Sequence, residues 1–232
     1  MSESLGRIER PAADSFRNQR KLLVVFLVYP YEGAPPGYLE RCERYWGQIG
    51  EQIGSLEARI GPVKHVYHES VYEAGEKGIE LAGRLNRYSH EISAGRVACG
   101  ATFEAFEERE LAAELSDLGR FLMLGFASSK VAQLVRDLHT QADKKRNEHV
   151  IGVVDSTLKP EEVGLLFVSE GHRLQFPPDV EVFSVVPPAL DELHRWLRDE
   201  SDRIRQEAAA EKQEVPDNEG ETVSGEEEKE VG

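Results

Sequence analysis

The stretch Lys21–Pro30, KLLVVFLVYP, constrains the fold more than any other part of the chain. No polar residue interrupts it between Leu22 and Val28, and Pro30 ends the apolar run. Continuous runs of Val, Leu and Phe are typical of strands that are buried on both faces of a sheet. The run is far shorter than the roughly 20 apolar residues that a membrane-spanning helix requires. It therefore predicts a strand at the centre of a sheet.

Long amphipathic segments after this strand predict helices. Apolar residues recur at alternating spacings of three and four over residues 38–60 and again over residues 71–92. Matching stripes of this kind predict an antiparallel helical hairpin, packed at the shallow angle of coiled coils. Gly78 lowers the helix propensity of the second stripe, but it permits the close approach of a neighbouring backbone. Further helices are expected over residues 103–126 and 128–158.

The final third of the chain predicts two more strands, at residues 164–169 (GLLFVS) and 180–186 (VEVFSVV). A tight turn at Glu170 would lead the chain back as an antiparallel meander. A parallel arrangement needs a crossover, which normally takes a dozen or more residues, and the segment from Glu170 to Asp179 has only ten. The short connection favours a mixed sheet, and an irregular crossover stays open. Pro188 predicts the first turn of a last helix.

These elements predict one α/β domain over residues 20–206, with a small mixed sheet covered by long helices. A helical insertion at about 38–158 separates the first strand from the C-terminal strands. Residues 1–19 are polar without an apolar period, which predicts a flexible N-terminal segment. Residues 207–232 are rich in Glu and poor in apolar side chains, which predicts a disordered acidic tail.

Charge and cysteine content narrow the partners and the compartment. The net charge is −15, and the ten acidic residues and two lysines from Glu207 onward account for −8 of it. Because phosphate binding needs clustered Lys and Arg, an acidic chain makes nucleic acid an unlikely partner and gives no reason to expect a membrane. The single basic cluster, residues 144–146, is expected to be a solvated helix end. Cys42 and Cys99 have no paired spacing, so a reducing cytoplasm fits best.

Two groups of titratable residues resemble sites, but the sequence favours a simpler role for each. In KHVYHES, residues 64–70, a strand would place His65 and His68 on opposite faces, where they could not bind one metal ion. Glu107 and Glu114 lie near the direction of the leucine stripe of the 103–126 helix. Carboxylate sites in helical bundles use Glu-x-x-His pairs, and the chain has none. No metal is therefore expected, and a solvated acidic first turn is favoured.

The loops after two strands are the candidate ligand site. In parallel α/β sheets, ligands bind beyond the carboxyl ends of the strands. Tyr31, Glu32 and Gly33 follow the first strand, and they would be joined by the loop after 164–169 if that strand runs parallel to it. No GxGxxG, GxxxxGK[ST] or GxSxG motif is present, so no cofactor is expected. The residues that this later loop would add are Ser169, Glu170 and His172.

Three functions follow as hypotheses. Two helical stripes without a complete catalytic or cofactor motif favour an interaction or regulatory protein, which presents helical surfaces to a protein partner or to itself. The alternative is a small-ligand-binding protein or an enzyme that uses the two candidate loops. A ribosome- or RNA-associated factor is the third, and it would depend on the basic cluster at residues 144–146. Whether the chain is an enzyme stays open.

Overall fold

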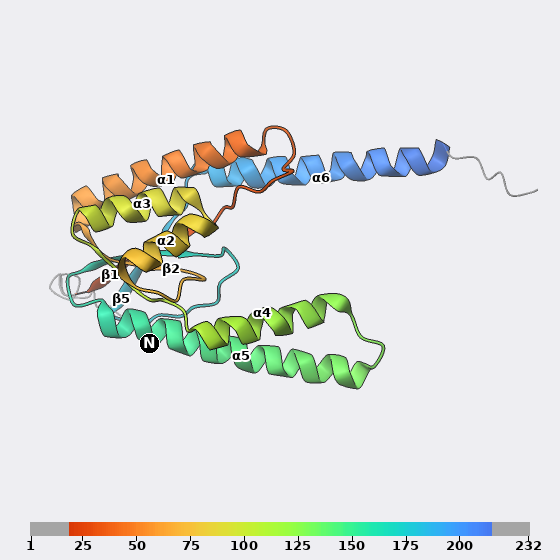
Figure 1. The fold of residues 1–232 in the computed structure, drawn as a ribbon. Helices are drawn as coiled ribbons and strands as arrows, with labels where there is room; N and C mark the ends of the chain where they lie inside the picture. Colours follow the sequence, from red (N-terminus) through yellow and green to blue (C-terminus); the bar gives the residue numbers. More distant parts are fainter. Residues whose placement is uncertain (1–18, 215–232) are drawn as a thin grey trace, which may run out of the picture. The chain divides into compact units, whose positions relative to one another are not determined.

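The computed structural model describes residues 19–214, and a parallel sheet of five strands runs through this part of the chain (Figure 1). The predicted α/β class is confirmed. The strands are β1 (Arg20–Phe26), β2 (Val63–His68), β3 (Thr102–Phe103), β4 (Val163–Val168) and β5 (Val180–Val185), in the spatial order β3-β2-β4-β1-β5. The helices are α1 (Tyr38–Ile60), α2 (Gly75–Leu85), α3 (Arg87–Ala98), α4 (Arg109–Leu124), α5 (Ser129–Thr157) and α6 (Pro188–Glu214).

All strand pairings among the described residues are parallel, which corrects the expected mixed sheet. The meander was wrong because β4 and β5 are not neighbours: β1 lies between them and pairs with both. The segment 169–179 crosses from β4 to β5 without regular structure. It has to cross two strand spacings, roughly 10 Å, and return along one strand length, roughly 20 Å, which eleven extended residues can span without a helix. The middle position belongs to β4, and β1 lies next to it.

The two faces of β1 and β4 are covered by different helices, which explains why both strands are almost wholly apolar. Leu22 and Val24 share one buried cluster with Leu166 and with Val150 and Val154 of α5. On the other face, Trp46 of α1 lies against Phe167, with 6.2 Å between the ring centroids. The strand expected from the apolar run is therefore buried on both sides.

The stripe of α1 packs on the sheet instead of pairing with another long helix. Its buried residues include Cys42, Trp46, Ile49 and Ile53. The polar atoms of its aromatic residues bond to the chain that leaves β1: Tyr45 Oη donates to the carbonyl of Phe26 at 2.5 Å, and Trp46 Nε1 donates to that of Val28 at 3.0 Å. The apolar stripe of α1 is therefore buried within the domain.

The helix expected over residues 71–92 is two helices, because Asn86 ends α2 and caps α3. The Asn86 backbone is extended, and its side chain accepts hydrogen bonds from the backbone N–H groups of Tyr88 and Ser89. Asn is among the strongest N-cap residues, so it starts a new helix where the apolar period alone predicts continuation. Phe103, expected at the start of a helix, instead lies with Thr102 in the edge strand β3.

A helical hairpin is present, but α4 and α5 form it. A short turn joins them, and Figure 1 shows the two helices side by side, extending away from the sheet. Ser128 caps α5 as expected, with its hydroxyl accepting from the N–H of Val131. The C-terminal half of α5 packs on the sheet, while its N-terminal half belongs to the hairpin.

The last helix begins at Pro188 as predicted. It continues past Glu207 to Glu214, into the segment expected to be disordered, and the rest of that segment lies outside the described residues. The predicted flexible segment 1–19 also lies almost entirely outside them. Along α6, Arg203 forms ion pairs with Glu200 and Glu207, one turn away on either side. Among residues 19–214, no helix is long and apolar enough to cross a membrane.

His68, at the end of β2, is fully buried and fixed at both ring nitrogens. Nδ1 lies 2.6 Å from the carbonyl oxygen of Glu69, which can only accept, so Nδ1 holds the proton. Nε2 lies 2.9 Å from the hydroxyl of Ser89. Burial lowers the pKa of His68, against the smaller opposing effects of the Glu69 carbonyl and carboxylate. The neutral form is therefore the native one.

This burial predicts a loss of stability in weak acid. Because the pKa of His68 is lower in the folded chain than in the unfolded one, the unfolded chain binds the proton first as the pH falls. The stabilisation is complete above pH of about 6.5 and is lost below it, at up to about 1.4 kcal/mol per pH unit. Urea unfolding at pH 7.5, 6.5 and 5.5 should show this slope, and H68N should flatten it. Equal slopes for the two proteins would contradict the assignment.

Candidate functional site at the carboxyl edge of the sheet

The carboxyl ends of β2 and β4 are neighbours, and the chain leaves them towards opposite faces of the sheet. After β2 it enters α2 and α3, on the α1 side (Figure 1). After β4 it enters the segment 169–179, whose Leu174 and Phe176 join the cluster on the α5 side. A divergence of this kind opens a crevice at the strand ends, and such crevices bind ligands in open α/β sheets.

The centre of this crevice is an ion-paired triad of Arg146, Glu69 and Glu107. Arg146 Nε lies 3.0 Å from Glu107 Oε2, and Arg146 Nη2 also donates to Glu107 Oε1. The same Nη2 donates to Glu69 Oε1 at 3.1 Å. The exposed fractions of these side chains are only 12% for Arg146, 15% for Glu69 and 3% for Glu107. The triad joins α5 to the loops after β2 and β3.

Backbone and hydroxyl donors complete the coordination of the two carboxylates. Glu69 Oε2 accepts from the backbone N–H of Ser169 at 2.6 Å and from the Ser169 hydroxyl. Glu107 Oε1 also lies 3.3 Å from the backbone N–H of Ser70, whose φ of 68° is left-handed. The negative charge of both carboxylates is therefore directed at fixed partners rather than at the crevice.

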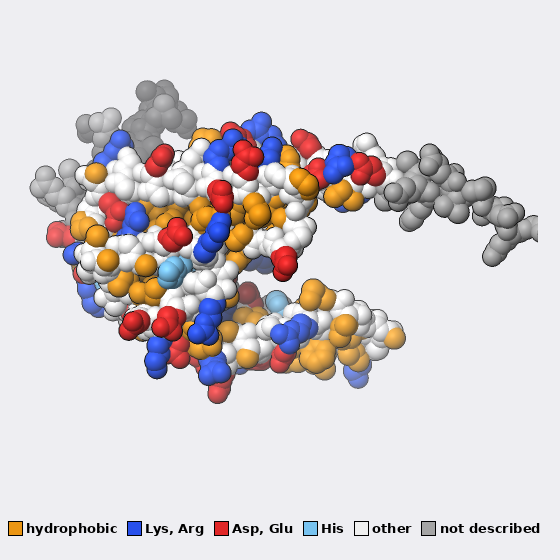
Figure 2. Space-filling view, turned by 45° about the horizontal axis from the view of Figure 1, so that its top comes forward, with side chains coloured by type: hydrophobic (Ala, Val, Ile, Leu, Met, Phe, Trp, Pro, Cys, Tyr) orange, Lys and Arg blue, Asp and Glu red, His pale blue; other side chains and the backbone are white. Residues whose placement is uncertain are grey.

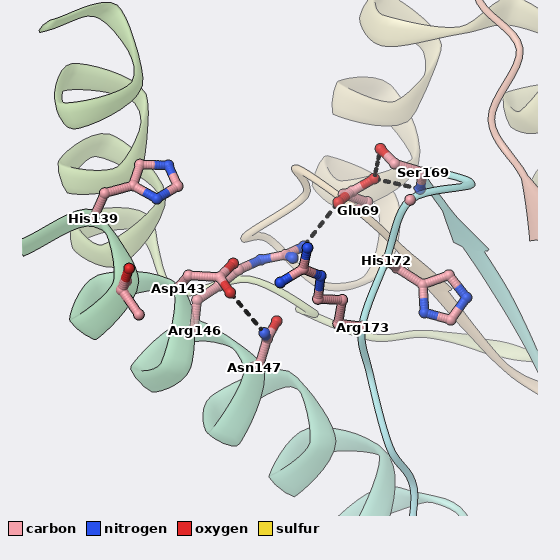
Figure 3. Close-up of a pocket in the computed structure, with 10 residues that line it drawn as sticks. Glu69, His139, Asp143, Arg146, Asn147, Ser169, His172 and Arg173 are labelled. Carbon is pink, nitrogen blue, oxygen red and sulfur yellow. Dashed lines mark hydrogen bonds and ion pairs between the residues drawn. The ribbon is translucent and has the colours of Figure 1, made fainter. Parts of the chain in front are cut away.

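A polar hollow of about 480 Å³ lies beside the triad (Figure 3). One of its walls is a single face of α5, and the other is formed by the loops after β2 and β4. Nine of its ten lining residues have a polar or charged side chain. The lining residues are Glu69, His139, Thr140, Asp143, Arg146, Asn147, Ser169, Gly171, His172 and Arg173.

An adjoining hollow of about 340 Å³ continues beneath the helical hairpin. It shares Arg146 and Asp143 with the first and reaches Leu115 and Ser116 of α4. The hairpin therefore forms part of the boundary of the crevice.

Arg173 differs from Arg146 in having no hydrogen bond or ion pair with any described residue. Figure 3 shows it reaching from the loop after β4 into the hollow, opposite the side chains of α5. Asp143, on the α5 wall, accepts from the side-chain amide of Asn147 at 3.1 Å. The hollow thus contains one guanidinium group that is paired with carboxylates and one that has no carboxylate partner within residues 19–214.

The charges of the triad affect the pKa of His172, which lines the hollow, and of Tyr29, which follows β1. Burial lowers the pKa of His172; the Glu69 carboxylate opposes this change, and the Arg146 guanidinium adds to it. The His172 ring lies 6.1 Å from that of Phe26, at the end of β1. Burial, with a smaller contribution from Glu69, raises the pKa of Tyr29 to about 12. His172 is therefore neutral, and Tyr29 keeps its proton.

The six predicted site residues all lie at this edge, because β1 and β4 are parallel. Ser169 and His172 line the hollow. Glu170 is exposed in the same loop and acts on the phenol of Tyr45. Tyr31, Glu32 and Gly33 are exposed in the loop after β1 and do not line the hollow. The Tyr31 ring packs instead on that of Tyr38, with 4.9 Å between centroids.

The residues that sequence reasoning missed are mostly on α5. His139, Asp143 and Arg146 recur at spacings of four and three, which places them on one helical face, in line with the buried Val150 and Val154. Arg146 was expected to be solvated as part of the basic cluster, yet it is buried in the triad, and only Lys144 and Lys145 are exposed. Glu107 precedes α4 and is buried, whereas Glu114, on α4, is exposed. Neither the apolar period nor the number of charges in the sequence distinguishes the buried charged residues from the exposed ones.

The remaining candidates lie apart from the crevice. His65, on the face of β2 opposite to His68, bonds to Glu104 at 2.8 Å and to Glu162 at 3.2 Å. No group of three metal-binding side chains occurs among residues 19–214. Cys42 is buried, Cys99 is exposed, and the two are not joined. Burial raises the pKa of Cys42 to about 11, as expected for an unreactive thiol.

The crevice, with its parallel sheet and polar lining, defines the chain as an α/β domain with a charged hollow at the carboxyl edge. The chain has no significant match among protein-family models, curated proteins or solved structures. Its function must therefore be inferred from its own residues.

Proposed function

We propose that the domain binds a small polar ligand in the hollow between α5 and the loop after β4. The ligand is expected to have an anionic oxygen group, either carboxylate or phosphate, together with hydroxyl or amino donors. The observation that supports this most is Arg173, a guanidinium group that points into the hollow without a carboxylate partner among the described residues (Figure 3). The volume of about 480 Å³ is in the range of small-molecule sites.

The charges of the two walls explain why the ligand needs both features. Glu69 and Glu107 are paired with Arg146, so Arg173 is the cation left to attract an oxyanion. Arginine is suited to this because its fork of N–H groups matches the two oxygens of a carboxylate or phosphate. Asp143, on the opposite wall, repels a simple anion but accepts hydrogen bonds from hydroxyl or amino groups.

Binding of inorganic phosphate and of glycerol 3-phosphate should distinguish these roles. Calorimetric titration should give a Kd of about 1 mM or tighter, with glycerol 3-phosphate binding more tightly because its hydroxyls reach Asp143. R173Q should lose binding of both probes. D143N should bind phosphate more tightly than the wild type and should lose the preference for glycerol 3-phosphate, because the repelling carboxylate is gone.

The matched control is R59Q, which removes an exposed arginine from the last turn of α1, outside the hollow. It should bind both probes like the wild type, and potassium chloride of equal ionic strength corrects for screening. The proposal fails if neither probe binds beyond the chloride control, or if R173Q and R59Q behave alike.

A second candidate function, protein–protein interaction, is favoured by the helical hairpin. Six of the thirteen large apolar side chains exposed on the described chain lie on its two helices. Figure 2 shows hydrophobic side chains gathered along this part of the surface. A ribosome- or RNA-associated role gains no comparable support, because Arg146 is engaged by two carboxylates and Lys144 lies 3.8 Å from Glu148.

A further inference from the structure

The hairpin of α4 and α5 leaves most of its apolar surface uncovered. The name "arm" is used here for residues 109–138. No residue of α4 is buried, although α4 contains five leucines, a phenylalanine and a methionine. Contiguous apolar surface of this kind marks an interaction site. The exposed residues are Phe121, Met123, Leu124, Val131, Leu134 and Leu138, with exposed fractions from 41% for Leu138 to 83% for Met123.

Two helices alone cannot bury an apolar face on each side. The arm has one layer of contacts, between α4 and α5, and its base is fixed by Arg109, which lies 5.3 Å from the ring centre of Tyr72. A common bundle that encloses such faces has four helices with antiparallel neighbours. A second pair of helices would therefore complete the arm.

The charges of the arm are complementary to those of a second arm. Its tip, residues 120–131, contains Arg120 and Lys130 and no acidic residue, so it has a charge of +2. The remainder, residues 109–119 and 132–138, contains the four acidic residues Glu110, Glu114, Asp117 and Asp137 and the two basic residues Arg109 and Arg136, so it has a charge of −2. When two arms lie antiparallel, each positive tip meets the negative part of the other. A parallel arrangement would place like charges together.

A lipid surface fits these charges less well. Helices that lie in a membrane interface have a strongly basic polar face, and anionic lipids attract such faces. The arm is neutral as a whole, and one of its two tip cations, Arg120, already lies 3.5 Å from Asp117.

We infer that two copies of this chain associate through their arms in an antiparallel pair. The apolar tip of one copy packs on Leu134 and Leu138 of the other, and the reverse contact follows from the two-fold symmetry. This inference goes beyond the ligand site and assigns the second candidate function to one occupant, a second copy of the chain.

Sedimentation of the full chain over a range of concentrations tests the pairing. The wild type should approach twice the chain mass of 26.0 kDa as its concentration rises. L134E should raise the dimer Kd at least about tenfold, because it buries a charge in the seam. L39E is the matched control, because it introduces the same charge at an exposed leucine on α1. Leu39 is 49% exposed, against 59% for Leu134. A wild-type monomer at all concentrations, or equal losses in the two variants, would overturn the inference.

Charge exchange tests whether the arms of two copies contact each other, and therefore the identity of the partner. The variant R120E/K130E makes the whole arm negative, and the variant D117K/D137K makes its two parts positive. Each should be monomeric alone, and an equimolar mixture should form a heterodimer, because every contact is then between opposite charges. If the mixture stays monomeric while the wild type is dimeric, the wild-type dimer does not form through the arms, and the inference is wrong.

Oxidation of Met123 separates failure of the pairing from failure of the interaction function. The chain has two methionines, Met1 and Met123, so peptide mapping resolves the exposed one on the arm. Hydrogen peroxide should convert Met123 to the sulfoxide more slowly as the dimer forms. A monomer with fast oxidation would leave the arm free for a different protein. A monomer with slow oxidation would mean that the chain covers its own arm, and the interaction function would fail as well.

Discussion

Replacing Arg146 with alanine should cost about 3–5 kcal/mol of the free energy of unfolding. The substitution leaves Glu69 and Glu107 as neighbouring carboxylates that are mostly removed from water and have lost their common cation. Removing one partner from a buried ion-paired group is strongly destabilising because the remaining charges are uncompensated. Urea unfolding of R146A at neutral pH, followed by circular dichroism, measures the loss directly.

Two further variants show whether charge is the cause. K145A changes the neighbouring residue, which is exposed on the same helix, and should stay within about 0.5 kcal/mol of the wild type. R146M/E107M removes the most deeply buried carboxylate together with the cation and should recover part of the loss. If R146A were no less stable than K145A, the triad would contribute nothing, and the position of α5 against the sheet would need another explanation.

Replacing Gly78 with alanine should destabilise the domain by about 2–3 kcal/mol. A Cβ atom at this position would lie 2.2 Å from the backbone oxygen of Glu73 and 2.7 Å from Cδ1 of Phe103, the buried edge-strand residue. The oxygen belongs to the backbone, so it cannot rotate away as a flexible side chain could. Overpacking of this kind typically costs 1–3 kcal/mol, and the backbone contact places Gly78 near the top of that range.

The same substitution at Gly54 should have the opposite sign. Gly54 is in the interior of α1, is exposed, and has open space where a Cβ would be. Alanine is favoured over glycine in a helix by up to about 1 kcal/mol, so G54A should be slightly more stable than the wild type. Thermal unfolding of both variants tests this difference. Similar effects at the two positions would show that helix propensity, not the close approach of β3, determines the role of Gly78.

The sequence predicts most of the elements of this fold but not their arrangement. The apolar run identifies β1, and Ser128 and Pro188 mark the starts of two helices, because these are local signals. No local signal gives the direction of β4, because that direction depends on the position of β1 between β4 and β5. The side chain of Asn86 caps α3 and so divides one predicted helix into two. The apolar period continues across Asn86 and therefore gives no sign of this break.

The sequence could predict where in the fold the candidate site lies, but not which residues line most of it. The rule that ligands bind at the carboxyl ends of parallel strands locates the correct loops once the strand directions are known. It finds Ser169 and His172. It cannot find Arg146 or Asp143, because they come from α5, which reaches the crevice only after the hairpin has doubled back. The sequence also does not distinguish Arg146 from the two lysines that precede it, because all three contribute the same positive charge.

The unbroken course of α5 has a consequence for how the chain can change in length. One helix lies against the sheet at Val150, lines the hollow at Arg146 and supplies half of the arm at Leu134. Each inserted residue within it would rotate everything beyond by about 100°. A single insertion between Leu138 and His139 would therefore turn the apolar side of the arm away from its present direction, with both ends intact. Insertions of seven residues, close to two full turns, should preserve the direction and only lengthen the arm.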